Sequence, residues 1–395
     1  MIMELLQNRA FSGSQSVQSE PSQLTAFEWL RQYADTRILS DLLDTFPAVR
    51  GVLNDQKSEC TIWAPVNAAW ADFESDDDGL ETLLQHHVSP HDMPLARILD
   101  TPNIPTLVYP ATLNGPLPIR ARPQNGRIVV NGHAMVINSD IIVTNGTIHL
   151  VDSVLRLPPP ISELAAFLPE SQFRHFRALL KGQDFLGKLK SSFPKGGTLF
   201  APTNEAFRNI GFENESFWAS DEGARYAEAL LKYHTIPGET LYSNMFYQGE
   251  NEAGVTSPPI QRKSSKPSEA QETAAKNSTP AAAASDSKPT PSPQKSSGKP
   301  KVLKGKRQFP LPTLLNGQWA NVEVSRCGGV ISMFVEEGRA SVVAQDIMTQ
   351  NGVVHAIDRL MIPPLTEGVL GADDVAQPTV ENLDELKRAL DGHLV

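Results

Sequence analysis

The side chains best suited to acid–base chemistry are four histidines, His87, His149, His234 and His355. A histidine near an aspartate can act as a general base, which is the enzymatic interpretation of His149 and His355. Neighbouring residues of a strand point to opposite faces, however, and an imidazole on a central strand most often satisfies a buried hydrogen bond. We therefore predict that these histidines stabilise the fold and that the protein is not an enzyme.

One cluster has residue types that bind metals, namely His86, His87, His91 and Asp92. Pro90 and Pro94 break the helix that would align these side chains, and the second half of the chain has no similar cluster. The sequence also lacks the GxSxG, P-loop and HExxH motifs and has no GxGxxG after a strand. It therefore predicts neither a metal site nor a cofactor.

Length and composition indicate more than one domain and one unfolded stretch. With 395 residues the chain is long enough for two or three domains. The 31 prolines exceed the average usage of about 5%. The formal net charge of -10 argues against a polyanion binder, and Cys60 and Cys327 supply neither a disulfide framework nor a thiolate zinc site. The sequence has no apolar run of about 18 residues, so a transmembrane helix is not predicted.

An internal repeat defines the architecture. Residues 61–70 return as residues 198–207, residues 83–88 return as residues 230–235, and residues 140–152 return as residues 346–358. The offset rises from 137 to 147 and then to 206 residues, so the second copy holds 59 extra residues between its second and third blocks. Three blocks in the same order indicate a duplicated domain.

Each copy is predicted to begin with helix and to continue into a strand, a turn and a second helix. Apolar residues at helical spacing indicate helix near residues 38–46 and 179–186. Residues 61–65 and 198–202 are short β-prone runs that end at a proline.

Four asparagines have positions that favour caps and turns. Asn67 and Asn204 are suited to capping the helix that follows each β-prone run. Asn145 and Asn351 each precede a glycine, and Asn-Gly is the dipeptide best suited to a tight turn with positive φ. The third block therefore predicts two short strands joined by a turn.

The insert has the composition of an unfolded segment. Residues 256–301 contain eight prolines, ten serines, no aromatic residue and one large aliphatic residue, which is too little apolar area to offset chain entropy. Residues 256–307 carry a net charge of +8, but they contain no aromatic side chain on which a base could stack, so nucleic-acid binding is not expected.

Together these patterns divide the chain into segments. We predict a flexible N-terminus at 1–23, domains at 24–160 and 161–364, a disordered insert at 250–308, and a tail at 365–395 with a short helix through Leu383, Leu386 and Leu390.

The blocks resemble the fasciclin-type domain of fasciclin I, periostin and many fungal, plant and bacterial surface proteins. The first family motif, Thr-hydrophobic-Phe-Ala-Pro-x-Asn-x-Ala-Phe, is complete at residues 198–207 and carries two tryptophan replacements at residues 61–70. The family's Tyr-His motif is intact at Tyr233-His234 and altered to His86-His87. The resemblance, closest to two-repeat fungal members, implies an α+β fold of two tandem domains, each a small twisted β-sheet or sandwich with packed helices.

The resemblance also implies a non-catalytic adhesion or scaffolding protein whose partner is a cell-surface, matrix or vacuolar protein or glycan, with weak self-association. Animal matrix members are proposed to bind integrins through an Asp-Ile pair, which points to Asp140, Ile141, Asp346, Ile347 and Met348. Alternatively, the isoleucines are core residues and the aspartates cap the strand pair. Adhesion predicts that Asp346 is exposed, whereas catalysis predicts that His355 is exposed beside an acid.

Three Asn-x-Ser/Thr sequons, at Asn145, Asn214 and Asn277, matter if the chain enters the secretory pathway. The family resemblance predicts the vacuole or cell surface. Residues 1–14 lack the continuous apolar segment of a signal peptide, which leaves a cytoplasmic location as the alternative. A protein that binds a small ligand or glycan in the vacuole or inside the cell is the alternative function.

Overall fold

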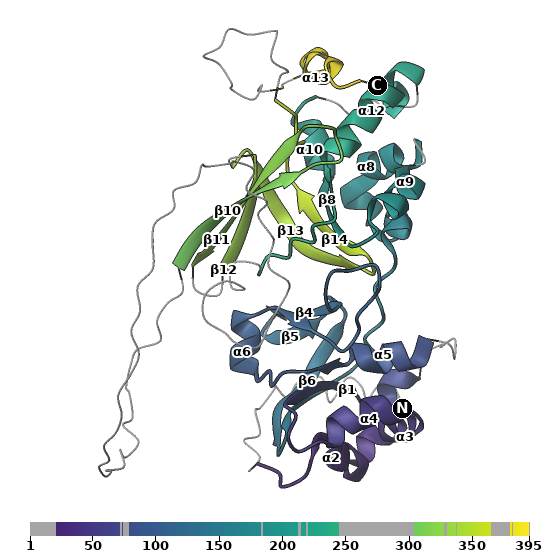
Figure 1. Ribbon diagram of the computed structural model, residues 1–395, viewed down its shortest axis with the longest axis vertical. Helices are drawn as coiled ribbons and strands as arrows, with labels where there is room; N and C mark the ends of the chain where they lie inside the picture. Colours follow the sequence, from purple (N-terminus) through teal and green to yellow (C-terminus); the bar gives the residue numbers. More distant parts are fainter. Residues whose placement is uncertain are drawn as a thin grey trace, which may run out of the picture.

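The computed structural model describes residues 21–71, 73, 79–182, 185–211, 215–218, 220–244, 304–327, 330–336, 338–364, 380 and 382–394. These residues form two α+β domains that lie one after the other along the long axis of the molecule (Figure 1). The predicted flexible N-terminus up to residue 20, most of the insert and the start of the C-terminal tail lie outside the described residues.

The first domain is built on a seven-stranded sheet with the order β2-β1-β7-β6-β5-β4-β3. All paired neighbours are antiparallel except β1 and β7, which are parallel. The strands are β1 (Cys60–Pro65), β2 (Val88–Ser89), β3 (Asn103–Pro105), β4 (Pro118–Gln124), β5 (Arg127–Val130), β6 (Ala134–Val143) and β7 (Gly146–Val151).

The second domain repeats this topology in the order β10-β11-β12-β13-β14-β8-β9, with β14 and β8 as the parallel pair. Its strands are β8 (Gly197–Pro202), β9 (Thr235–Pro237), β10 (Lys304–Pro312), β11 (Trp319–Cys327), β12 (Val330–Val335), β13 (Ala340–Thr349) and β14 (Gly352–Ile357). The shared strand order confirms the predicted duplication and the α+β class, with one sheet per domain.

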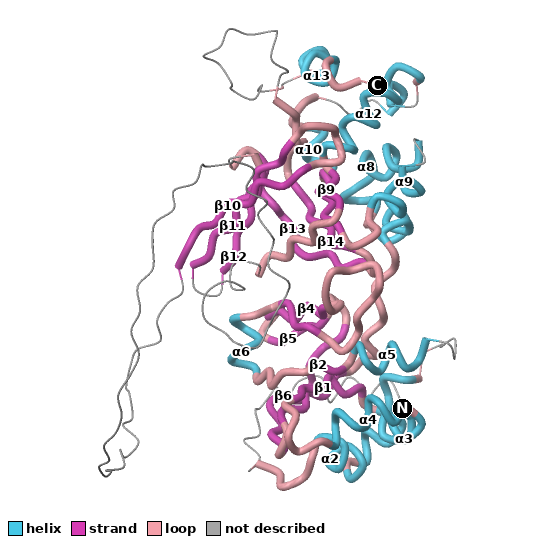
Figure 2. Tube along the Cα trace, in the orientation of Figure 1, coloured by secondary structure: helices cyan, strands magenta, loops and turns pink. Residues whose placement is uncertain are grey.

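Most helices of each domain lie together on one side of its sheet (Figure 2). The helices of the first domain are α2 (Ala26–Gln32), α3 (Arg37–Thr45), α4 (Pro47–Asn54), α5 (Leu80–His86) and α6 (Leu95–Asp100), with the 3-10 turns η1 (Ala34–Thr36) and η2 (Asn67–Trp70). The helices of the second are η4 (Ile161–Glu163), α7 (Leu164–Phe167), α8 (Glu170–Gly182), α9 (Phe185–Ser192), α10 (Asn204–Arg208), α11 (Glu215–Trp218), α12 (Asp221–Tyr233) and α13 (Leu383–Asp391). The exceptions are α6, which lies beside β4, and α13, which lies beside α12.

The motif asparagines after β1 and β8 do not cap the following helix, so that prediction was wrong. Val66 and Thr203 hold the cap positions, and neither makes a side-chain cap hydrogen bond. Asn204 instead reaches α8: its Nδ2 donates to Ser171 O at 3.0 Å, and its Oδ1 accepts the His175 N–H at 3.3 Å. Asn67 makes the equivalent pair of bonds near α3. The asparagines therefore attach the strand–turn element to an earlier helix.

The predicted hairpins of the third block are present, and their glycines serve strand packing. Val143 pairs with Gly146, and Thr349 pairs with Gly352. A Cβ on Gly146 would collide with the backbone oxygen of Cys60 in the neighbouring parallel strand, and Gly352 has the same relation to Gly197. Positive φ is found at Gly146 but not at Gly352. Close approach of the parallel strand therefore explains both glycines, whereas turn geometry explains at most one.

The insert ends earlier than predicted. Strand β10 begins at Lys304 and pairs with all of β11, from Lys304 opposite Cys327 to Pro312 opposite Trp319. Residues 304–308 therefore belong to the sheet. These basic residues belong to an edge strand, where exposed lysines are common. Lys306 is exposed and forms an ion pair with Glu323 at 2.7 Å.

The C-terminal helix α13 docks on the second domain, with Leu386 and Leu390 in its core and Leu383 packed against it. Tyr226 in α12 donates its hydroxyl to Asp391 Oδ1 at 2.6 Å. Lys387 adds an ion pair with Glu222 at 2.7 Å. The predicted amphipathic helix therefore completes the apolar cover of this domain.

Replacing Tyr226 by phenylalanine is expected to lower the free energy of unfolding by about 1 kcal/mol, because Asp391 loses its hydrogen-bond donor while the apolar ring stays in place. Urea denaturation of the full chain measures this change. Tyr109→Phe, at a site where 68% of the residue is exposed, is the control. Equal stability of Tyr226→Phe and wild type would contradict the docking contact.

Candidate functional site

The histidines of the Tyr-His motif are buried and fully hydrogen-bonded. His234 Nδ1 lies 2.8 Å from Leu230 O and is the donor, and His234 Nε2 accepts the Met361 N–H at 3.0 Å. His87 makes the same two bonds in the first domain. Burial lowers the pKa of both imidazoles to about 4, so both are neutral at pH 7. Each connects the end of a helix to the segment that follows the last strand.

The histidines of the third block are equally enclosed. His355 Nε2 donates to Leu241 O at 2.8 Å, and His355 Nδ1 accepts the backbone N–H of Asp346 at 3.2 Å. His149 makes the equivalent pair of bonds. Burial lowers the pKa of His355 to about 4 and also lowers the pKa of His149. Neither ring is exposed to solvent, so the geometry expected of a catalytic His355 is not found.

The altered Tyr-His motif of the first domain is matched by a second altered residue. Tyr233 donates its hydroxyl to Glu336 Oε1 at 2.8 Å. In the first domain His86 replaces the tyrosine, and its Nε2 lies 3.4 Å from Asn131 Nδ2. Asn131 and Glu336 share an unusual backbone, with φ of 50° and 54°. Both members of the Tyr233–Glu336 pair are therefore different in the first domain, where His86 and the half-buried Asn131 take their places.

Asp140 and Asp346 sit in equivalent irregularities of β6 and β13, with φ of 57° and 56°. Asp140 accepts the Leu95 N–H at 2.7 Å, and Asp346 accepts the Ser243 N–H at 2.8 Å. Each aspartate therefore binds an earlier segment of its own domain: Leu95 begins α6, and Ser243 follows β9. This contact is the common, structural part of the Asp-Ile motif.

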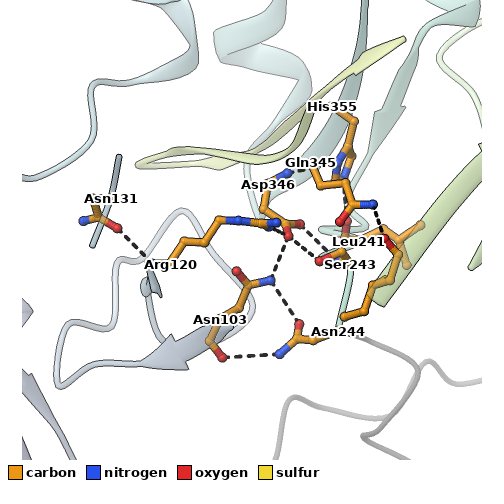
Figure 3. A network of polar contacts seen from close by, with 10 residues as sticks. Asn103, Arg120, Asn131, Leu241, Ser243, Asn244, Gln345, Asp346 and His355 are labelled. Atoms are coloured by element: carbon orange, nitrogen blue, oxygen red, sulfur yellow. Dashed lines mark hydrogen bonds and ion pairs between the residues drawn. The ribbon is translucent and has the colours of Figure 1, made fainter. Parts of the chain in front are cut away.

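Asp346 has a second set of partners, and these come from the first domain (Figure 3). Its Oδ2 forms an ion pair with Arg120 Nη1 and accepts Asn103 Nδ2 at 3.0 Å. Asn103 Nδ2 also donates to Asn244 Oδ1, and Asn244 Nδ2 donates to the backbone oxygen of Asn103, each at 3.3 Å. The Asp346 side chain is fully buried. The third-block aspartate of the second domain therefore belongs to the domain interface.

Further contacts extend this interface. Arg326 in β11 bonds Asp100 Oδ1, at the end of α6, at 3.1 Å. Thr112 donates to Gln350 O at 3.3 Å. Burial lowers the pKa of Arg120 to about 10, with Arg122 adding to the effect, so Arg120 keeps its charge at pH 7.

Two of the five predicted partner-binding residues, Asp346 and Ile141, are buried and therefore not available to an external protein. Asp346 is 4% exposed and Ile141 is 6% exposed, so the expectation of an exposed Asp346 was wrong. Ile141 packs in the first core, as the alternative interpretation predicted. Ile347 is half-buried against the second core, and Met348 is half-buried. Asp140 is half-buried and is engaged by Leu95.

A cavity of about 740 Å³ lies beside the Asp346–Arg120 pair. Its first-domain wall includes Arg120, Arg122 and Arg156, and its second-domain wall includes residues 344–348 of β13 and Phe167. Ile347 and Met348 therefore line a cleft between the domains. The volume falls within the range of about 300 to 1,000 Å³ that is typical of small-molecule sites.

The structure also bears on the remaining sequence candidates. Asn145 is buried, and its Nδ2 donates to Leu53 O at 3.0 Å, which leaves no room for a glycan in the folded domain. Asn214 and Asn277 lie outside the described residues.

Asp92, one of the residues of the metal-ligand type, accepts the Thr147 hydroxyl at 2.6 Å. The described part of the chain holds no group of three or more metal-ligating side chains. No described helix is long and apolar enough to cross a membrane.

The first-domain residues of the interface, Arg120 and Asn103, were not predicted from the sequence, and neither was the contact of Asn103 with Asn244. The signal in the sequence was weak. Arg120 and Arg122 alternate with Ile119 and Ala121, which marks one polar face of a strand, but nothing in that pattern says that the face meets a second domain.

The chain belongs to the fasciclin domain family, whose model matches residues 34–158, 171–285 and 299–363. It is similar to Aurofusarin biosynthesis cluster protein S of Gibberella zeae, with 25% identity over 365 residues that cover 86% of this chain and 78% of the relative. It is also similar to a Fasciclin-like arabinogalactan protein of Arthroderma benhamiae, with 32% identity over 114 residues (29% of this chain, 25% of the relative).

Human periostin is 32% identical over 188 residues, which cover 46% of this chain and 21% of periostin. Among solved structures, the FAS1 domain pair of the insect cell adhesion molecule fasciclin I aligns with 17% identity and a TM-score of 0.35, over 86% of this chain and 98% of that one.

Proposed function

We propose that the protein is a non-catalytic scaffold in which two fasciclin domains are fixed to each other and bind a partner as one unit. The observation that carries the proposal is the pairing of the buried Asp346 with the half-buried Arg120 and with Asn103. A buried ion pair with further hydrogen bonds fixes one relative arrangement, because other arrangements leave buried charges unpaired. A fixed pair presents a composite surface that neither domain has alone.

The proposal that the protein is not catalytic is supported by the four histidines of the Tyr-His motifs and the third blocks. Both ring nitrogens of His87, His149, His234 and His355 are used by hydrogen bonds within the fold. A general base has to reach the proton that it removes, and these rings have no free nitrogen to offer. Their arrangement favours stabilisation of the sheet and the neighbouring helix.

The partner is a cell-surface, matrix or vacuolar protein or glycan, the role that family membership favours, and the chain reaches it through the secretory route. The similarity to a fasciclin-like arabinogalactan protein supports this setting. A small-ligand role, in the vacuole or inside the cell, is the second candidate. It is favoured by the cleft between the domains and by the similarity to a protein named for the aurofusarin biosynthesis cluster.

The secretory route predicts a glycan at Asn277. Treatment of the natively expressed protein with an N-glycosidase is expected to increase its gel mobility, and the Asn277→Gln variant is expected to lose one glycan step. Asn214→Gln serves as the matched sequon variant. An unshifted protein located in the cytosol would overturn the adhesion setting and favour an intracellular binding role.

A further inference from the structure

The cleft between the domains has one strongly cationic wall. Arg120 and Arg122 are two residues apart in β4 and therefore lie on the same face of the strand. Arg156, which follows β7, lines the same cavity. Three guanidinium groups thus border one space in a chain whose formal net charge is -10.

Only one of these arginines has a carboxylate partner among the residues that the structure describes. Asp346 pairs with Arg120. The other lining acid, Asp152, accepts the Met135 N–H at 2.8 Å and the Ser153 hydroxyl at 3.0 Å. Arg122 and Arg156 are exposed to the cavity and to solvent, so the lining carries positive charge that the described carboxylates do not match.

The rest of the cavity lining is mixed, and its apolar side chains lie on both walls. Leu157 and Val154 contribute from the first domain, and Phe167, Ile347 and Met348 contribute from the second. A small inorganic anion would leave these side chains in contact with water. A ligand that has an acidic group and an apolar body matches both parts of the wall.

We propose that the cleft binds an amphipathic organic anion, with its acidic group at Arg122 and Arg156 and its apolar ring system or chain against Leu157, Phe167, Ile347 and Met348. The inference rests on the fixed domain pair proposed above, because the two walls belong to different domains. It assigns Ile347 and Met348 a role in ligand contact. Arginine is suited to this role because its planar group can donate two hydrogen bonds to one acidic group.

The test uses two fluorescent probes with the same ring system. The first, 8-anilinonaphthalene-1-sulfonate, carries an acidic group, and the second, N-phenyl-1-naphthylamine, does not. We expect the full-length protein to bind the sulfonate at one site with a dissociation constant on the order of tens of micromolar. The neutral probe is expected to bind at least tenfold more weakly, and inorganic phosphate is expected not to displace the sulfonate.

Arg122→Gln and Arg156→Gln are each expected to weaken sulfonate binding roughly tenfold, the effect of losing a charge-assisted hydrogen bond. Arg37→Gln is the matched control, because Arg37 is exposed on α3 and does not line the cavity. Equal binding of the two probes, or wild-type affinity in both arginine variants, would overturn the anion site.

Small-angle X-ray scattering on the same samples separates the two ways in which the inference can fail. Scattering that matches the docked domain pair, together with equal binding of the two probes, would refute the anion site and leave the scaffold proposal in place. Scattering from two independently moving domains would refute the fixed pair, and with it both proposals.

Discussion

Replacing Asp346 by asparagine is expected to lower the free energy of unfolding by about 3 to 5 kcal/mol, whereas the same change at Asp140 is expected to lower it by only about 1 kcal/mol. Both aspartates accept a backbone N–H from an earlier segment of their own domain, Asp346 from Ser243 and Asp140 from Leu95. Only Asp346 also pairs with the half-buried Arg120, which the asparagine variant leaves without an opposite charge. Asp140, the equivalent residue of the first domain, is therefore the matched control for Asp346.

Asparagine is the appropriate replacement because both positions have φ near +56°, a conformation that asparagine tolerates better than alanine does. Chemical denaturation of the two variants at pH 7 measures the difference. Similar losses at the two positions would mean that the contact with the first domain contributes little.

The second large effect is a loss of folding stability when the pH is lowered. His87, His234 and His355 have pKa values lowered by burial to about 4, compared with about 6.5 in the unfolded chain. Between these values the unfolded state binds protons that the folded state does not, so stability falls as the pH falls from 6.5 to 4 and levels off below 4. Each of these histidines is expected to contribute a loss of about 2 kcal/mol between pH 7 and pH 5.

His86 adds to this effect, since burial lowers its pKa to about 3. It belongs to the first domain, and the equivalent residue in the second domain is Tyr233. The first domain is therefore expected to be the more acid-sensitive of the two. The losses from these four histidines together approach the free energy of unfolding of a typical domain, which is about 5 to 15 kcal/mol.

The pH dependence of urea denaturation tests this expectation. His234→Gln is expected to reduce the slope of stability against pH by about 1.4 kcal/mol per pH unit between pH 4.5 and 6, which corresponds to one proton fewer. The variant is less stable at pH 7 as well, but the slope is measured independently of that offset. A slope equal to that of wild type would show that the buried imidazole does not take up the proton on unfolding.

Much of the fold was predictable because it depends on local and repeated patterns. The three repeated blocks predicted the duplication, and the Asn145-Gly146 dipeptide predicted the hairpin that the structure contains. For Ile141 the sequence left two interpretations open, partner contact and burial in the core, and the structure shows burial. The start of β10 was missed because Lys304, Lys306 and Arg307 resemble the charged insert, although they occupy an edge strand.

The site was predictable only in part, because its decisive contacts join residues far apart in the chain. Asp346 and Asp140 have the same motif and the same backbone, so the sequence could not tell which of them meets another domain. Arg120 and Asn103 lie 226 and 243 residues before Asp346, and no spacing rule links them to it. Asn67 and Asn204 were assigned caps for a similar reason, since their true partners lie on an earlier helix.

A double-mutant cycle on Arg120 and Asp346 tests most directly whether the two domains are held as one unit. The free energy of unfolding is measured for the wild type, Arg120→Gln, Asp346→Asn and the double variant in the full chain. We expect a coupling energy of at least about 2 kcal/mol, with the double variant more stable than the sum of the single changes predicts. Additive losses, with coupling near zero, would contradict the fixed domain pair.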